Sequence, residues 1–149
     1  MSKKTCRKCM TILTLTTRNP IPIIYKLTLG FDFMVNDFHK NLKNLLDEYA
    51  HFVYNLSRTF PREEIYGVTS QLRRATLSVV LNYIEGFARF SEKAKKNFYV
   101  TSYASLKESK YLLHFSLVEE YLNKEDYSKA LDIANKIGAM LWGIIKNDK

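Results

Sequence analysis

The sequence predicts an all-α fold, an antiparallel up-down-up-down four-helix bundle. Four long segments contain almost no proline or glycine, and the whole chain of 149 residues has only three prolines and five glycines. Within these segments apolar residues recur at steps of three and four, the period of a helix with one buried face. Only short turns separate the segments. Hydrophobic residues make up 46% of the chain, which suits a single domain with a sizeable core.

The first 34 residues differ from the rest of the chain. They are rich in threonine, contain two of the three prolines and show no sustained helical period. Six basic residues against Asp32 give them five of the eight units of net positive charge. Met34 begins a stretch that looks like a natural protein start. We therefore expect residues 1–34 to be an extension, either disordered or a mispredicted start, and residues 35–149 to form the bundle.

The first helix is expected from Asn36 or Asp37, either of which can cap it, to about Arg58. Phe60 and Pro61 then end it, because the residue before a proline avoids the helical region. Its apolar positions follow the helical period: Phe38, Leu42, Leu45, Leu46, Tyr49, Phe52, Val53 and Leu56.

The second helix, within residues 60–90, carries a polar stripe between two apolar sectors. The stripe contains Gln71, Arg74, Ser78, Asn82, Glu85 and Arg89. One apolar sector contains Leu72, Val79, Val80, Tyr83, Phe87 and Phe90, and the other contains Leu77, Leu81, Ile84 and Ala88. A helix that is apolar on most sides is usually buried by several neighbours. The stripe would then be an internal polar seam in which Arg74 and Arg89 reach Glu85; the alternative is an ordinary solvated face.

The last two helices are expected at residues 92–121 and from Lys124 onward. Ser91 and Asn123 precede them as caps, with Asp126 supporting the first turn of the second one. Ser102, Ser105 and Ser109 give the third helix small side chains that permit close approach of a neighbour. Gly138 and Gly143 lie inside the fourth helix at a cost in stability, which predicts tight helix contact there.

We expect neither a metal nor another cofactor. Cys6 and Cys9 form one C-x-x-C pair, whereas a structural zinc site needs four ligands. Glu48 and His51 make one E-x-x-H, but a di-iron bundle needs two copies and two further glutamates. Two cysteines imply no disulfide framework, and nothing approaches the length of an apolar membrane span, so a cytoplasmic location is expected.

The sequence predicts a protein that is not an enzyme. No phosphate-binding glycine loop, nucleophile motif or zinc signature is present. None of the histidines, His39, His51 and His114, follows an arginine at the four-to-six-residue spacing of four-helix ribonucleases. We expect His114 to be a partly buried core residue. No catalytic residue is assigned.

Basic residues are the best candidates for a binding site. Residues 58–110 hold ten basic and five acidic groups. Such an excess permits nucleic-acid binding through phosphates. Phe90, Phe98 and Tyr99 lie nearby and either stack on bases or, as their spacing favours, pack in the core. The candidate nucleic-acid-binding residues are Arg58, Arg62, Arg73, Arg89, Lys93, Lys95, Lys96, Lys107 and Lys110.

Four stretches of the chain resemble a known family. They are FPREEIYGVTSQLRRA from Phe60, NYIEGF from Asn82, SLKESKYLL from Ser105 and IGAMLWGIIK from Ile137. In this order they resemble the four-helix-bundle family of 23S rRNA intervening-sequence proteins, over about residues 37–146. The same family includes the accessory variability determinant of diversity-generating retroelements, a basic pentamer that binds a reverse transcriptase and nucleic acid.

The resemblance implies a homopentamer with a nucleic-acid-associated role. It carries over a set of positions that we interpret as a structural seam between the second and third helices: Gln71, Arg74, Ser78, Asn82, Glu85, Ser105 and Glu108, with Arg73 and Gly86 beside them. The oligomer interface is expected at the second apolar sector, Leu77, Leu81, Ile84 and Ala88. The chain departs from the family pattern at four positions, Val80, Ile84, Ala88 and Ala104.

Two functions remain open from the sequence. The first is an oligomeric accessory protein that binds RNA or DNA phosphates through a basic rim formed by the subunits. The second is a homo-oligomeric scaffold, docking for example a reverse transcriptase, whose basic residues do not contact nucleic acid.

Overall fold

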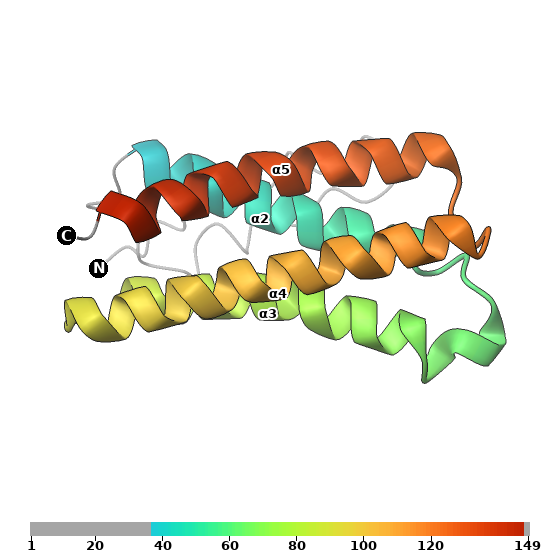
Figure 1. Cartoon of the computed structure of the whole chain (residues 1–149), viewed down its shortest axis with the longest axis horizontal. Coiled ribbons are helices and arrows are strands. Elements are labelled where there is room, and N and C mark those ends of the chain that lie inside the picture. Colours follow the sequence, from blue (N-terminus) through green and yellow to red (C-terminus); the bar gives the residue numbers. More distant parts are fainter. Residues whose placement is uncertain (1–36, 148–149) are drawn as a thin grey trace, which may run out of the picture. The chain divides into compact units, whose positions relative to one another are not determined.

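The computed structural model describes residues 37–147. They form four helices and one short 3-10 helix, η1, in the order α2 (Asp37–Leu56), η1 (Arg62–Ile65), α3 (Val68–Ala88), α4 (Glu92–Val118) and α5 (Lys124–Asn147). Helices α2 and α4 each pack against both α3 and α5, and successive helices run in opposite directions (Figure 1). The predicted four-helix bundle is confirmed. The expectations for residues 1–34, including the cysteine pair, lie outside the described residues.

The core lies between the four helices. Its aliphatic centre is less than 2% exposed and consists of Leu42, Leu46, Val53, Leu72, Val79, Leu106, Leu113, Ile137 and Leu141. Tyr49 of α2 crosses this core, and its hydroxyl lies 2.9 Å from the Ser109 hydroxyl of α4. Burial raises the pKa of Tyr49 to about 12, although the hydrogen bond to Ser109 acts in the other direction. The diagonal hydrogen bond therefore fixes α2 against α4 at mid-length.

The chain between α2 and α3 differs from the prediction. Helix α2 ends at Leu56, two residues before the predicted Arg58. Glu63 and Glu64 lie in η1, ahead of the long helix α3, which begins only after Gly67. The Glu64 carboxylate nevertheless accepts a hydrogen bond of 2.9 Å from the Val68 N–H. The acid satisfies a free donor at the start of α3, as expected from the helix dipole, but from outside the helix.

Helix α4 ends at Val118, three residues before the predicted end. The reason is Glu120, the residue whose φ of 60° turns the backbone into the left-handed region. The N–H groups of Tyr121 and Leu122 then donate to the carbonyl of Ser116, at 2.8 and 3.2 Å. Leu122 is buried, so the turn also closes the core.

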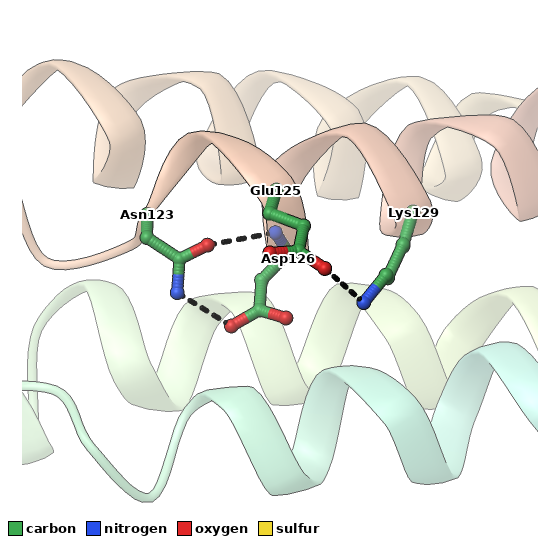
Figure 2. A network of polar contacts seen from close by, with 4 residues as sticks. All are labelled: Asn123, Glu125, Asp126 and Lys129. Atoms are coloured by element: carbon green, nitrogen blue, oxygen red, sulfur yellow. Dashed lines mark hydrogen bonds and ion pairs between the residues drawn. The ribbon is translucent and has the colours of Figure 1, made fainter.

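The start of α5 confirms the predicted cap at Asn123. The Asn123 Oδ1 accepts a hydrogen bond of 2.8 Å from the Asp126 N–H, and its Nδ2 donates to the Asp126 carboxylate at 2.7 Å (Figure 2). One turn on, Lys129 pairs with Glu125 at 2.7 Å. The first of these contacts satisfies a backbone donor that a helix start leaves free, and the other two join side chains. Ser91 precedes α4 as predicted, but its side chain makes no capping hydrogen bond.

The glycines of α5 are not equally crowded. A Cβ on Gly138 would lie 3.4 Å from Leu106 of α4, an ordinary packing distance. A Cβ on Gly143 would meet nothing within 4 Å. The predicted tight contact at Gly143 is therefore wrong: the position faces open space.

Candidate nucleic-acid interface

Helices α3 and α4 form the most extensive helix pair and position the turn between them. Their contact is lined by serines. The Ser102 hydroxyl donates to the Val79 carbonyl at 2.7 Å, and the Ser78 and Ser105 hydroxyls lie 2.8 Å apart. Asn82 donates to the Ser78 carbonyl at 2.7 Å. Small side chains bring the two helices together, and their hydroxyls satisfy one another inside the contact.

The structure assigns only the middle of the predicted polar stripe to this contact. Ser78, Asn82 and Ser105 lie within it, whereas the remaining members, Gln71, Arg74 and Glu108, are exposed. Arg89 pairs with Glu85. Arg74 lies eleven residues from Glu85, about 16 Å along a helix, and does not reach it. Gln71, Arg74 and Glu108 therefore lie on a solvated face, the alternative that the sequence left open. The expected pair of Arg89 and Glu85 is present.

The second apolar sector of α3 is exposed on the single chain. Leu77 is 39% exposed, Leu81 61% and Ile84 47%, and Ala88 is exposed as well. Helices α2 and α4 cover the opposite part of α3, and this sector, where the sequence places an oligomer interface, stays open on the single chain. These four residues, the α3 apolar strip, form one continuous stripe of surface.

Basic side chains gather at the turn from α3 to α4. Arg89, Lys93, Lys95 and Lys96 lie in the eight residues around this turn, and we call them the basic rim. Arg89 pairs with Glu85 and lies 5.0 Å from the centre of the Phe98 ring. Lys95 pairs with Glu92 at 2.6 Å, and Lys93 is exposed. The turn carries four positive charges against two negative ones.

The aromatic residues near the rim have different environments. Phe90 is fully exposed and does not pack in the core, contrary to the prediction. Tyr99 is 4% exposed and does belong to the core. Phe98 is half-buried beneath Arg89. Phe90 is therefore the aromatic side chain of the rim that is open to a stacking partner.

The opposite end of the bundle is acidic. Arg58 and Arg62 lie there and are exposed, but the turns around them hold six acids: Glu63, Glu64, Glu119, Glu120, Glu125 and Asp126. Partial desolvation raises the pKa of the Tyr121 hydroxyl, and the negative charges of Glu64 and Glu119 add to the effect. This shift shows that acids from η1 and from the end of α4 converge. The bundle is thus polarised along its length, and the structure does not bring Arg58 and Arg62 together with the rim.

Arg73 has a structural contact. Its Nε donates to the Ser57 hydroxyl at 2.7 Å, and its guanidinium lies 5.3 Å from the centre of the Tyr54 ring. The side chain is half-buried and connects α3 to the end of α2. Although it is a predicted nucleic-acid-binding residue, Arg73 therefore has a structural role within the bundle.

A groove lies between α4 and α5, of about 220 Å³. Lys107 and Lys110 line it, together with residues that the sequence interpretation did not assign to any site: Tyr103, Leu106, Ala134, Asn135, Gly138, Ala139 and Trp142. Trp142 is 46% exposed, and its ring packs on one side against Tyr103, with the ring centres 5.5 Å apart. The sequence contains one sign of this site: Trp142 and Lys146 are one helical turn apart, so an aromatic and a basic side chain share a face of the helix.

The histidines lie apart from one another. The Nδ1 of His39 is 2.9 Å from the Tyr83 hydroxyl, and burial lowers the pKa of His39. His51 is exposed beside Asp47, at 3.6 Å. His114 is exposed, contrary to the prediction, with its ring 6.2 Å from that of Tyr127. Within residues 37–147, no three histidine, cysteine or acidic side chains converge as metal ligands. None of the helices in this range is long and apolar enough to cross a membrane.

The fold and the site define a small helical bundle with one basic end. A model of the 23S rRNA-intervening sequence protein family matches residues 41–143, so the chain belongs to this family. Among solved structures, a protein of unknown function from the S23 ribosomal protein family of Bacteroides thetaiotaomicron is similar, with a TM-score of 0.66 and 24% identity. The match covers 70% of this chain and 98% of that one, and shows the shared fold. No curated protein matches the chain.

Proposed function

We propose that this protein is a non-enzymatic, oligomeric accessory protein that binds RNA or DNA phosphates through the basic rim. The observation that carries the proposal is the charge polarity of the bundle. Four basic residues meet at the α3–α4 turn, while acids dominate the opposite end. A phosphate backbone is attracted to one end only. The family name, which refers to an rRNA gene, is in keeping with a nucleic-acid partner.

Self-association through the α3 apolar strip strengthens such a site. Leu81 and Ile84 stay about half exposed, in a stripe of four residues on one helix, which favours a second copy as the covering surface. In a closed ring, the pentamer that the family resemblance implies, each subunit would contribute one rim. The phosphate contacts would then act multivalently.

A triple charge reversal tests the rim. We expect Lys93→Glu with Lys95→Glu and Lys96→Glu to weaken binding of a structured RNA. Removing three phosphate contacts lowers the slope of log affinity against log salt by about 2 to 3. The measurement is a titration of labelled RNA at low and moderate salt, with light scattering to show that the oligomer persists.

A control variant reverses two lysines at the acidic end, Lys124→Glu and Lys129→Glu. These side chains lie in the first turns of α5, at the end of the bundle opposite the rim. We expect their reversal to leave the slope of log affinity against log salt unchanged. Equal binding by the wild type and the triple rim variant would refute the proposal. A control variant that weakens binding as much as the triple variant would show that only net charge matters, which also contradicts a rim.

A second function is favoured by the same exposed strip. The protein would be a homo-oligomeric scaffold that docks a protein, for example a reverse transcriptase, without contacting nucleic acid. In support of it, two of the four rim cations already pair with acids of their own chain, Arg89 with Glu85 and Lys95 with Glu92. An intact oligomer that binds no RNA at low salt would favour the scaffold.

A further inference from the structure

The groove between α4 and α5 differs from the rim in the partners of its cations. The Lys107 ammonium lies 5.0 Å from the centre of the Tyr103 ring, and the Lys110 ammonium donates to the Asn135 amide oxygen at 2.7 Å. Beside the groove, one turn after Trp142, the Lys146 ammonium lies 5.3 Å from the centre of the Trp142 ring. These contacts are all with neutral groups, and no acid lines the groove. Its positive charge is therefore not neutralised, unlike that of Arg89 or Lys95.

The same groove presents an aromatic surface. The rings of Tyr103 and Trp142 are 5.5 Å apart and tilted by 35°. Trp142 nevertheless remains 46% exposed, and Gly138 keeps the α5 surface beside it free of a side chain. An indole held by a neighbouring ring is a rigid platform for a flat partner. Stacking of a base on it is worth more than the exposed contact with a lysine, so Lys146 can move aside.

The Trp142 end of the groove lies toward the basic end of the bundle. Trp142 and Lys146 lie in the last two turns of α5, which end where α4 begins and the rim is found (Figure 1). Asp132 of α5 is one turn before Asn135 and thus further from the rim. An extended anionic chain can follow the groove away from that acid.

We propose that this groove binds single-stranded nucleic acid, with one base stacked on Trp142 and the adjoining phosphates on Lys107, Lys110 and Lys146. The site extends the proposed function from phosphate contacts to contacts with unpaired bases, yet it does not depend on the rim. A double helix hides its bases in the stack and does not fit such a site.

The only tryptophan of the chain is Trp142, so its fluorescence reports on this groove alone. The test titrates the full-length protein with a short single-stranded RNA and, separately, with an abasic strand of equal phosphate number. Anisotropy of the labelled strands measures binding at any site. We expect the RNA to quench Trp142 strongly and the abasic strand to quench it little. We expect Trp142→Leu to weaken RNA binding by about 5- to 150-fold.

Two lysine variants separate the groove from general charge. Lys107→Gln with Lys110→Gln should reduce the salt slope by about 1.4, the value for two contacts with a single strand. Lys136→Gln is the control, because Lys136 lies on the other side of α5, in a depression shared with α2. We expect the control to bind like the wild type.

The possible outcomes distinguish this inference from the rim proposal. Binding seen by anisotropy without quenching, and unaffected by Trp142→Leu, overturns the groove and leaves the rim standing. Quenching that persists in the triple rim variant supports the groove and shows that it acts alone. Equal quenching by the abasic strand overturns base stacking. Emission that changes with protein concentration and not with RNA places a second copy in the groove and overturns the inference.

Discussion

At the scale of single residues, two glycines have opposite surroundings: Gly86 lies in a crowded helix contact and Gly143 faces open space. A Cβ on Gly86 of α3 would lie 2.8 Å from the Tyr99 ring and 3.1 Å from Phe98, and Tyr99 is only 4% exposed. Gly143 of α5 has nothing within 4 Å. The first glycine is needed for close approach of α3 and α4, whereas the second only costs helix stability.

The two glycines therefore respond in opposite directions to alanine. We expect Gly86→Ala to lower the free energy of unfolding by about 1 kcal/mol or more, because overpacking outweighs the gain in helix propensity. Gly143→Ala should raise it by about 1 kcal/mol. Urea unfolding of both variants at one protein concentration checks this. A shift of the same sign in both would contradict the described contact at Gly86.

His39 gives the bundle a dependence on pH. Burial lowers the pKa of His39 below its usual 6.5, so the unfolded chain binds a proton more readily than the folded one. The contribution to stability is fully present above about pH 6.5 and is lost as the pH falls through the lowered pKa. We expect the free energy of unfolding to decrease over this window.

Two variants isolate this effect. His39→Gln keeps a group that can hydrogen-bond the Tyr83 hydroxyl but does not titrate, so it should flatten the pH dependence. His51→Gln, which removes an exposed histidine beside Asp47, should retain the slope of the wild type. Urea unfolding across the acidic range measures both, and parallel curves for His39→Gln and the wild type would exclude His39 as the cause.

At the scale of elements, α3 has a face that the bundle does not use. Its buried side packs on α2 and α4, but the strip from Leu77 to Ala88 stays exposed. Exposed apolar stripes of this kind mark contact surfaces. Helix α3 thus has one face that packs within the bundle and one apolar face that the described residues leave exposed.

One substitution in the strip tests the proposed self-association. We expect Leu81→Lys to remove the burial of a leucine, about 1.5–3 kcal/mol per contact, and so to weaken association by about 10- to 150-fold. Val118→Lys is the matched control, because both residues are 61% exposed and Val118 lies outside the strip. Light scattering should show a lower mass for the first variant only. A mass that stays unchanged in Leu81→Lys would exclude the strip as the interface.

At the scale of the whole molecule, the sequence predicted the architecture well and the surface poorly. Helical periodicity and caps such as Asn123 are local signals, so helix number, order and the buried faces followed from them. Exposure of Phe90 and the open space at Gly143 depend on which neighbour faces each position, and periodicity does not report that. The groove at Trp142 needs α4 and α5 to be aligned along their lengths, which no local pattern contains. The left-handed Glu120 that ends α4 early likewise carries no strong sequence signal.

The serine-lined contact between α3 and α4 also bears on how such a sequence can change over time. The Ser102 hydroxyl of α4 donates to the Val79 carbonyl of α3. A larger side chain at position 102 would push α3 and α4 apart. Every residue type at position 79 has this backbone carbonyl, so the hydrogen bond does not restrict which apolar residue occupies that position. Drift in this lineage should therefore be slow at Ser102 and Gly86 and fast on the solvated faces of α2 and α5. Relatives can differ in most of their surface and still keep this pair of helices at one spacing.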